Sequence, residues 1–278
     1  MRLHLCGVRG STPAPGPAFA RVGGHTSCVA VAHRAEPAPR LLLDGGTGLR
    51  RVAELLDGGP FEGALLLGHL HWDHTQGIPF FAAGDRPDAR VDVHLPVADG
   101  DAAHGLDGLM APPFFPIEAS ELHGRWSFQA LDEGSLEVEE FTVLVREIPH
   151  TGGRTFGFRV GDGDGTIAYI SDHGPIALGP GPDGWGPYHD AVCELTDGVD
   201  VLLHDAQFTA AELADRPHFG HSAADYAVAL AERCHVDRLL LYHHDPDRTD
   251  DEVDALVDDY RGSPVKVAAA VEGDVIEV

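Results

Sequence analysis

The residues with the clearest chemical potential lie in one hexapeptide, HLHWDH at positions 69–74, which directly follows the apolar run ALLLG. In an extended chain His69 and His71 project to the same side, and Asp73 and His74 can fold back from the following turn. These imidazole and carboxylate donors suit Zn²⁺, Mn²⁺ or Fe. The alternative is an exposed polar loop. Burying four such groups without a cation would leave unpaired polar atoms, at about 1–3 kcal/mol each. We therefore expect a metal site.

The segments that must position this motif read mainly as strands. Short apolar and β-branched runs, separated by Gly and Pro, predict strands. The predicted strands are 2–8, 28–33, 40–46, 64–71, 91–95, 138–148, 155–160, 166–172, 199–206, 238–244 and 265–271. The stretches 96–135 and 179–187 are irregular and predict loops that border a substrate cleft.

Fewer segments have helical patterns. Thr47 is a candidate N-cap for a helix over Leu49–Leu56 that ends at Gly58. The stretch 222–234 is Ala-rich, and Thr249 begins a capping box before a third helix. Strands dominate the first two thirds, and helices alternate with strands later. This order predicts two sheets covered by helices, not a doubly wound parallel sheet, within a single domain over 1–278.

Composition restricts the partners. The chain has 45 acidic and 19 basic residues, and a net charge of −26 disfavours DNA, tRNA and anionic membrane surfaces. The four cysteines form no CxxC pair, and no apolar run approaches the ~20 residues that cross a bilayer. The N-terminal apolar run is too short for a signal peptide. We therefore expect a reduced, cytoplasmic enzyme without a membrane partner.

The hexapeptide resembles the HxHxDH signature of the metallo-β-lactamase superfamily. The resemblance implies an α/β fold, an αββα four-layer sandwich with two mixed β-sheets flanked by helices. It also implies two metal ions, one bound by the first two His and a later His. The Asp and last His of the motif bind the other ion with a still later His, and a second Asp bridges both. On this sequence the implied ligands are His69, His71 and His150 for one ion, Asp73, His74 and His243 for the other, and Asp172 between them.

Each later ligand has an alternative when taken alone. His150 could be an ordinary residue at a strand end, and Asp172 could cap a turn together with Ser171. His244 competes with His243, because alternation along a strand points the two side chains in opposite directions. The family order, a strand followed by His and a short loop, favours His243.

Further segments resemble the phosphodiesterase branch of the superfamily, which includes ribonuclease Z and the phosphoribosyl cyclic phosphodiesterases. They are CGVRGSTPAPGP (6–17), GGHTSCVAV (23–31), LLLDGGTG (41–48), HDAQF (204–208) and FGHS (219–222). By this resemblance His221 contacts the scissile phosphate and donates a proton. Asp205 takes the place of the branch's Glu and is shorter by one methylene. Without the resemblance, Asp205 caps a loop, and His221 is a solvated side chain beside a helix that Ser222 opens.

The sequence departs from the branch in two places, and the first of them, together with the net charge of −26, points to a small phosphodiester as substrate. Only residues 151–171 separate His150 from Asp172, where ribonuclease Z carries a long tRNA-binding arm. His25 stands where Asn is usual, either as a substrate contact or as a structural replacement.

The resemblance thus implies hydrolysis of a small or cyclic phosphodiester by a metal-bridging hydroxide that Asp73 orients. Zn²⁺ is favoured over Mn²⁺ or Fe, and a homodimer is possible. Thioester or lactone hydrolysis on the same fold, and a non-catalytic metal- or ligand-binding protein, are the alternatives.

Overall fold

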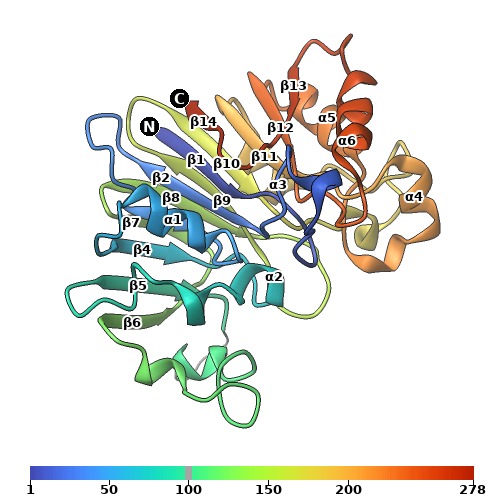
Figure 1. The fold of residues 1–278 in the computed structure, drawn as a ribbon. Helices are drawn as coiled ribbons and strands as arrows, with labels where there is room; N and C mark the ends of the chain where they lie inside the picture. Colours follow the sequence, from blue (N-terminus) through green and yellow to red (C-terminus); the bar gives the residue numbers. More distant parts are fainter. Residues whose placement is uncertain (98–101) are drawn as a thin grey trace.

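The fold consists of two seven-stranded sheets packed face to face, with helices on their outer faces (Figure 1). The computed structural model describes residues 1–97 and 102–278. The first sheet has the order β14 (Val275–Glu277), β1 (Arg2–Gly7), β2 (Cys28–Ala32), β3 (Leu41–Leu43), β4 (Glu62–Leu66), β5 (Arg90–Leu95) and β6 (Arg125–Ala130). The second has the order β13 (Lys266–Ala269), β12 (Arg238–Tyr242), β11 (Val201–Asp205), β10 (Thr166–Ile170), β9 (Phe156–Gly161), β8 (Phe141–Glu147) and β7 (Gly134–Val138).

Both sheets are mixed. Strands β3 to β6 are parallel in the first sheet and β10 to β13 in the second, while the remaining pairs are antiparallel. The helices are α1 (Leu49–Leu55), α2 (Trp72–Thr75), α3 (Asp190–Thr196), α4 (Ala210–Asp215), α5 (Ala224–Arg233) and α6 (Asp250–Asp258). Helix α1 packs on the first sheet, and α3, α5 and α6 pack on the second, so the predicted αββα sandwich is confirmed. Within the described ranges, every helix is too short or too polar to cross a bilayer.

The central strands are buried on both faces. In β10, Ile167 and Tyr169 belong to the core between the sheets, whereas Ala168 and Ile170 pack against the outer helices. Strands covered on both faces have nearly continuous apolar sequences instead of alternating ones. This double burial explains why the central strands were readable from the sequence as apolar runs.

The predicted strand 138–148 is confirmed over Phe141–Glu147 as β8, but its N-terminal end is wrong. The chain forms a hairpin there, in which Val138 pairs with Phe141 across a turn at Glu139 and Glu140. Both turn residues have left-handed backbones, with φ of 49° and 65°. Two-residue hairpin turns of this kind are usually signalled by Asn-Gly or Asp-Gly. A Glu-Glu pair does not indicate a turn in the sequence. In the structure Arg90 donates a hydrogen bond of 2.7 Å to the Glu139 carboxylate.

The predicted cap at Thr47 is also wrong, because α1 has Gly48 as its N-cap and no side-chain cap. Thr47 instead exchanges hydrogen bonds with Thr26: each backbone N–H donates to the other's hydroxyl at 2.9 Å. The capping box at Thr249 and Glu252 is confirmed at the start of α6. The Ala-rich helix α5 begins two residues after Ser222.

The predicted loop 96–135 is only partly irregular, because β6 and the first residues of β7 lie within it. Residues 98–101 of this stretch lie outside the described residues. Strand β6, RWSFQA, does alternate polar and apolar residues, but none of its side chains is fully buried and it lies within a stretch rich in Gly and Pro. The short strand β14 was missed because it has only three residues, of which only Ile276 is buried.

Candidate metal centre

Two groups of potential ligand side chains meet at the ends of the strands and share Asp172. Within each group the candidate donor atoms all lie within 4.8 Å of one another. One group consists of His69, His71, His150 and Asp172, and the other of Asp73, His74, His243 and Asp172. All seven residues that the sequence singled out as ligands are therefore brought together, divided in the way that the resemblance implied.

The Asp172 carboxylate faces both groups, one oxygen to each. Its Oδ1 lies 3.0 Å from Nε2 of His74 and 3.2 Å from Nε2 of His243. Its Oδ2 lies 3.6 Å from Nε2 of both His69 and His150. Asp172 follows β10 and is fully buried, and in this position it could contribute one oxygen to each of two ions.

The hexapeptide turns sharply after β4. His71 has an extended backbone and is the N-cap of the one-turn helix α2, whose first residues are Trp72 and Asp73. This turn folds His74 back toward His69, so that their ring centroids are 4.1 Å apart, and those of His69 and His71 are 4.4 Å apart. The end of β4 and the single turn of α2 thus bring the four potential metal ligands of the hexapeptide close together.

Asp44 orients His74, and sequence reasoning had assigned it no role. His74 Nδ1–H donates to Asp44 Oδ2 at 2.7 Å, which leaves Nε2 facing the cluster. The carboxylate also accepts bonds from the Gly68 amide (2.8 Å) and the Tyr169 hydroxyl (2.7 Å). Burial by itself lowers the pKa of His74, but Asp172, Asp73 and Asp44 together raise that pKa well above its usual value. The sequence did contain a signal for Asp44, since this carboxylate directly follows the apolar strand in LLLDGG (41–46).

His150 is held from the side opposite to the cluster. Its Nδ1–H donates to the Gly220 carbonyl at 2.6 Å, and its Nε2 lies 3.3 Å from Nδ1 of His71. The turn after His150 passes so close that a Cβ on Gly152 would lie 2.6 Å from Nε2 of His71. Burial lowers the pKa values of His69, His71 and His150, which favours the neutral, metal-binding form of each ring.

The choice between His243 and His244 is decided by the backbone after β12. His243 has a left-handed φ of 57°, and its Nε2 lies 3.1 Å from Asp73 Oδ2. The Nε2 of His244 instead bonds to the Ala270 carbonyl at 2.9 Å, away from the cluster. Of the two residues, His243 is therefore the one in the cluster, as the family order favoured.

The donor set fits a pair of cations. Several buried polar atoms of the cluster have no hydrogen-bond partner within the described residues; they are both ring nitrogens of His69, Nε2 of His74, Nδ1 of His243 and Oδ1 of Asp172. A buried polar atom without a partner lowers the stability of the fold. Three of these atoms, His69 Nε2, His74 Nε2 and Asp172 Oδ1, lie within 3.6 Å of another potential metal ligand. Burial alone raises the pKa of Asp73, but the neighbouring His74 and His243 hold it well below its usual value. Anionic carboxylates among mostly neutral imidazoles are the chemistry that a divalent cation completes.

A buried pair of His221 and Asp205 lies beside Asp172. His221 Nδ1 is 3.0 Å from Asp205 Oδ2 and 3.8 Å from Asp172 Oδ2. The Asp205 carboxylate also accepts the backbone amides of His173, Ser222 and Gln207 at 3.0, 3.2 and 3.0 Å. The shorter Asp thus reaches the imidazole, and the alternative of a solvated His221 is wrong, because its side chain is buried. Burial alone lowers the pKa of His221, but the Asp205 carboxylate outweighs it and raises the pKa to about 9.

His25 lies outside both groups of ligands. Its backbone N–H donates to Glu272 Oε2 at 3.0 Å, and its Nδ1 lies 3.1 Å from the Thr47 hydroxyl. These contacts join the loop before β2 to neighbouring loops. These contacts favour the interpretation of His25 as a structural replacement for Asn over that of a substrate contact.

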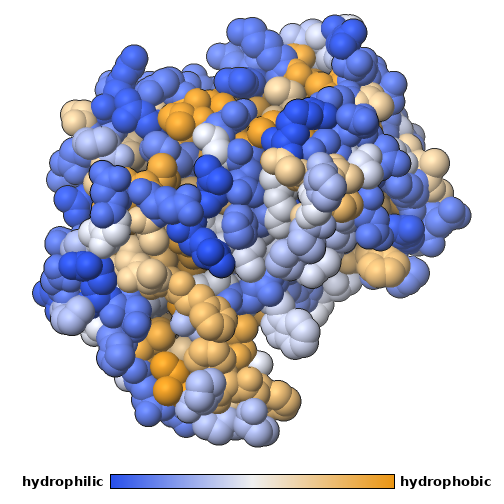
Figure 2. Space-filling view, viewed as in Figure 1, coloured by the Kyte–Doolittle hydropathy of each residue, from blue (hydrophilic) through white to orange (hydrophobic). Residues whose placement is uncertain are grey.

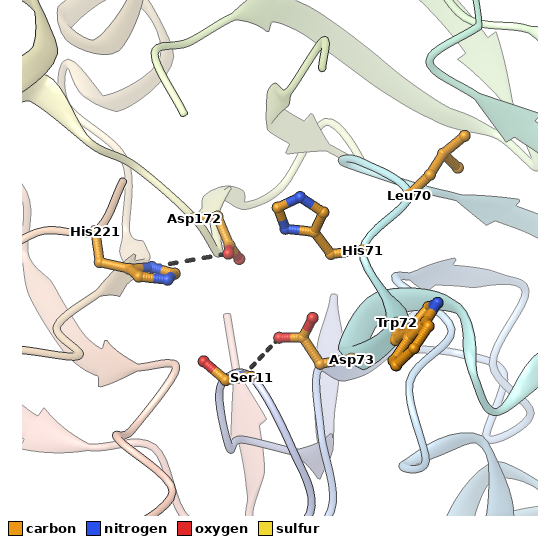
Figure 3. A pocket seen from close by; sticks show the side chains of 7 residues that line it. All are labelled: Ser11, Leu70, His71, Trp72, Asp73, Asp172 and His221. Carbon is orange, nitrogen blue, oxygen red and sulfur yellow. Dashed lines mark hydrogen bonds and ion pairs between the residues drawn. The ribbon is translucent and has the colours of Figure 1, made fainter. Parts of the chain in front are cut away.

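The cluster opens to solvent through a pocket of about 370 Å³. It is lined by Ser11, Leu70, His71, Trp72, Asp73, Asp172 and His221 (Figure 3). Ser11, which sequence reasoning did not single out, donates its backbone N–H to Asp73 Oδ2 at 2.7 Å and has a left-handed φ of 62°. The pocket is therefore lined by members of both ligand groups and by His221.

An αββα sandwich with this cluster at one edge defines a metallo-β-lactamase-fold protein. The chain belongs to that hydrolase family, because residues 40–244 match the family described as Beta-lactamase superfamily domain.

Comparisons with individual proteins agree with this family. Ribonuclease Z from Anoxybacillus flavithermus is 25% identical over 224 residues, covering 64% of this chain and 68% of that protein. Ribonuclease Z from Exiguobacterium sp. is 44% identical over 50 residues, only 18% of this chain and 17% of that protein. Among solved structures, the metallo-β-lactamase fold protein YhfI from Bacillus subtilis has a TM-score of 0.72 at 19% identity, covering 99% of both chains. A diphosphatase from the PhnP family has a TM-score of 0.71 at 18% identity, covering 100% of this chain and 97% of that one.

Proposed function

We propose that this protein is a dinuclear metal-dependent phosphodiesterase that cleaves a small or cyclic phosphodiester. The observation that carries the proposal is the buried pair of His221 and Asp205 beside the shared Asp172. The seven-residue cluster alone also suits thioester or lactone hydrolysis. A carboxylate-supported imidazole facing the same pocket adds a proton donor for an alkoxide leaving group, which phosphodiester cleavage uses.

Two divalent cations, Zn²⁺ in preference to Mn²⁺ or Fe, are proposed to bind the two groups that share Asp172. Such ions lower the pKa of a water nucleophile and polarise a phosphate oxygen. In each group one histidine is held in place by a partner outside the cluster. Asp44 fixes His74, and the Gly220 carbonyl fixes His150, so both present Nε2 to the site.

His221 is proposed to donate the proton to the leaving oxygen. Its Nδ1–H is held by Asp205, which directs the other ring nitrogen toward the pocket and stabilises the protonated ring. When the P–O bond breaks, the leaving alkoxide takes the proton from this imidazolium. Asp205 acts through His221, and Asp73 orients the nucleophile beside the Ser11 amide.

A small substrate fits the chain better than tRNA. The stretch 151–171 contains only the turn after His150 and the antiparallel pair β9 and β10, in which Gly161 pairs with Thr166. The net charge of −26 repels a polyanion. Both features support a substrate that fits within the pocket.

The proposal is tested by measuring metal content together with hydrolysis of matched probes. The purified protein is assayed with bis(p-nitrophenyl) phosphate, a cyclic nucleotide, a thioester and a lactone. We expect phosphodiester hydrolysis that requires bound metal and exceeds the other activities. Hydrolysis of the thioester or lactone alone would assign the site to the alternative chemistry, and no hydrolysis of any probe would favour a binding protein.

The role of His221 is tested by His221→Ala. We expect kcat for bis(p-nitrophenyl) phosphate to fall about 10²- to 10⁴-fold, because a positioned proton donor is lost. Metal content and unfolding temperature show whether the site is otherwise intact. His218→Ala is the control, since this nearby histidine is exposed and lies outside both ligand groups. An unchanged kcat in the His221 variant would exclude the proposed role.

A further inference from the structure

The most unusual side chain at the pocket is Trp72, which lies between His71 and Asp73 and is 72% exposed. Tryptophan is a highly buried residue type on average, so this exposure is uncommon. Within residues 1–97 and 102–278, the indole has no stacking partner and its N–H has no hydrogen-bond acceptor. The ring therefore contributes little to the stability of the fold.

Two other large aromatic side chains, Trp126 in β6 and Tyr188 in the loop before α3, are already occupied. The indole N–H of Trp126 donates to the His123 carbonyl at 2.7 Å, and its ring stacks on Phe128. Tyr188 stacks on Tyr226. Trp72 differs from these residues because its large aromatic face lines the pocket and is free.

The backbone of Trp72 is fixed even though its side chain is exposed. Its carbonyl accepts the Gln76 amide at 2.7 Å, and the His71 carbonyl accepts the His74 amide at 3.1 Å. The side chain thus starts from a fixed point of the backbone, between two candidate ligands. An aromatic side chain anchored next to reactive groups is suited to positioning a substrate.

The pocket has two chemically different walls (Figure 3). Leu70 and Trp72 lie on one side, and His221 lies on the other, with the carboxylates of Asp73 and Asp172 between them. Further apolar side chains gather on the same face of the molecule, around the segment between β5 and β6 (Figure 2). A substrate that fits this pocket has an anionic end and a planar apolar end.

We propose that Trp72 stacks on a nucleobase, so that the substrate is a nucleotide-type phosphodiester. The inference deepens the proposed function and rests on it for the phosphate-binding end. Every nucleobase has a π-face, and stacking on an aromatic side chain strengthens binding by roughly ten- to a hundredfold for each base. An aliphatic group would gain no such stacking energy from the indole.

The first experiment measures binding without turnover. Adenosine 5′-monophosphate and ribose 5-phosphate are titrated calorimetrically into the metal-loaded protein. We expect the nucleotide to bind at least tenfold more tightly, and Trp72→Ala to abolish that difference. Trp72→Phe should retain most of it, because a stacking face remains. Phe114→Ala is the matched control, since Phe114 is 82% exposed but does not line the pocket, and it should bind as the wild type does.

The second experiment compares turnover of adenosine 2′,3′-cyclic phosphate and glycerol 1,2-cyclic phosphate. Trp72→Ala should lower kcat/KM for the nucleotide by at least tenfold and change that for the glycerol ester less than twofold. An equal loss on both substrates would overturn the stacking role. If the wild type hydrolyses neither ester, the proposed function fails, and the calorimetric difference still decides whether the indole binds a base.

A remaining outcome concerns a second copy of the chain. If Trp72→Ala converts a dimer to a monomer in size-exclusion chromatography and leaves the ratio of nucleotide to ribose phosphate affinity unchanged, the indole belongs to a subunit interface. That result would overturn the proposal.

Discussion

At the scale of single residues, the candidate centre depends on side chains that bind no metal themselves. Asp44 has the clearest effect, because its carboxylate accepts bonds from His74, Gly68 and Tyr169 while fully buried. The anion fixes which nitrogen of His74 carries the proton and makes the other a better donor. Its left-handed φ of 61° is a conformation that Asn also adopts readily.

Asp44→Asn should therefore fold normally but weaken metal binding about 10- to 100-fold, because the negative charge on the far side of His74 is lost. The measurement is a competition titration against a chelator. Tyr169→Phe is the comparison, since it removes one bond to Asp44 and keeps the charge, and its loss should be smaller. Metal affinity in Asp44→Asn equal to that of the wild type would show that His74 does not need this partner.

At the scale of elements, the chemistry gathers where parallel strands end. Asp172, Asp205 and His243 come at or just after the ends of β10, β11 and β12, and Asp44 and His69 follow β3 and β4. Next to these ends, three histidines form a chain between β10, β11 and the start of α3. His204 Nδ1–H donates to the Asp205 carbonyl (2.7 Å), His173 bonds to His204 (3.1 Å), and His189 bonds to His173 (2.9 Å).

This chain predicts a pH dependence of stability. Burial lowers the pKa of His204 to about 4, so the folded protein favours the neutral ring, whereas an unfolded chain titrates near 6.5. The free energy of unfolding therefore does not depend on this ring above pH 6.5. As the pH falls from 6.5 to 4, the unfolded chain takes up the proton and the free energy of unfolding decreases by about 3 kcal/mol.

The measurement is the free energy of unfolding of wild type and His204→Gln between pH 7 and 4. The variant lacks the titrating ring, so the difference between the two proteins should shrink as the pH falls, and losses common to both cancel. A difference independent of pH would contradict the buried neutral ring.

Much of this arrangement was readable from the sequence, for physical reasons that also explain the failures. Strands buried on both faces give long apolar runs, and metal ligands at strand ends are polar residues that interrupt such runs, as His150 and Asp172 do. The left-handed turn at Glu139 and Glu140 has no such contrast. Strand β6 alternates polar and apolar residues but lacks a continuous apolar run, so it was not distinguished from the loops around it. Asp44 was overlooked because its partner His74 is 30 residues away, and sequence spacing does not reveal a contact of that range.

At the scale of the whole molecule, the candidate centre joins the two sheets. The first sheet supplies the hexapeptide and Asp44, and the second supplies His150, Asp172 and His243. The loop after β1 is already tied to the end of β12, because the Gly10 amide donates to the His244 carbonyl at 2.9 Å and the His244 amide donates to the Val8 carbonyl at 3.0 Å. Metal binding between these segments should therefore stabilise the sandwich as a unit.

The division of the seven side chains into two groups with a shared Asp172 is tested most directly by metal stoichiometry. The metal content per chain is measured by mass spectrometry for the wild type, His150→Ala and His243→Ala after saturation and gel filtration. Of the two groups that share Asp172, each of these histidines belongs to only one. We predict two ions per chain in the wild type and one in each variant. A single ion in the wild type, or two ions retained in both variants, would contradict the account.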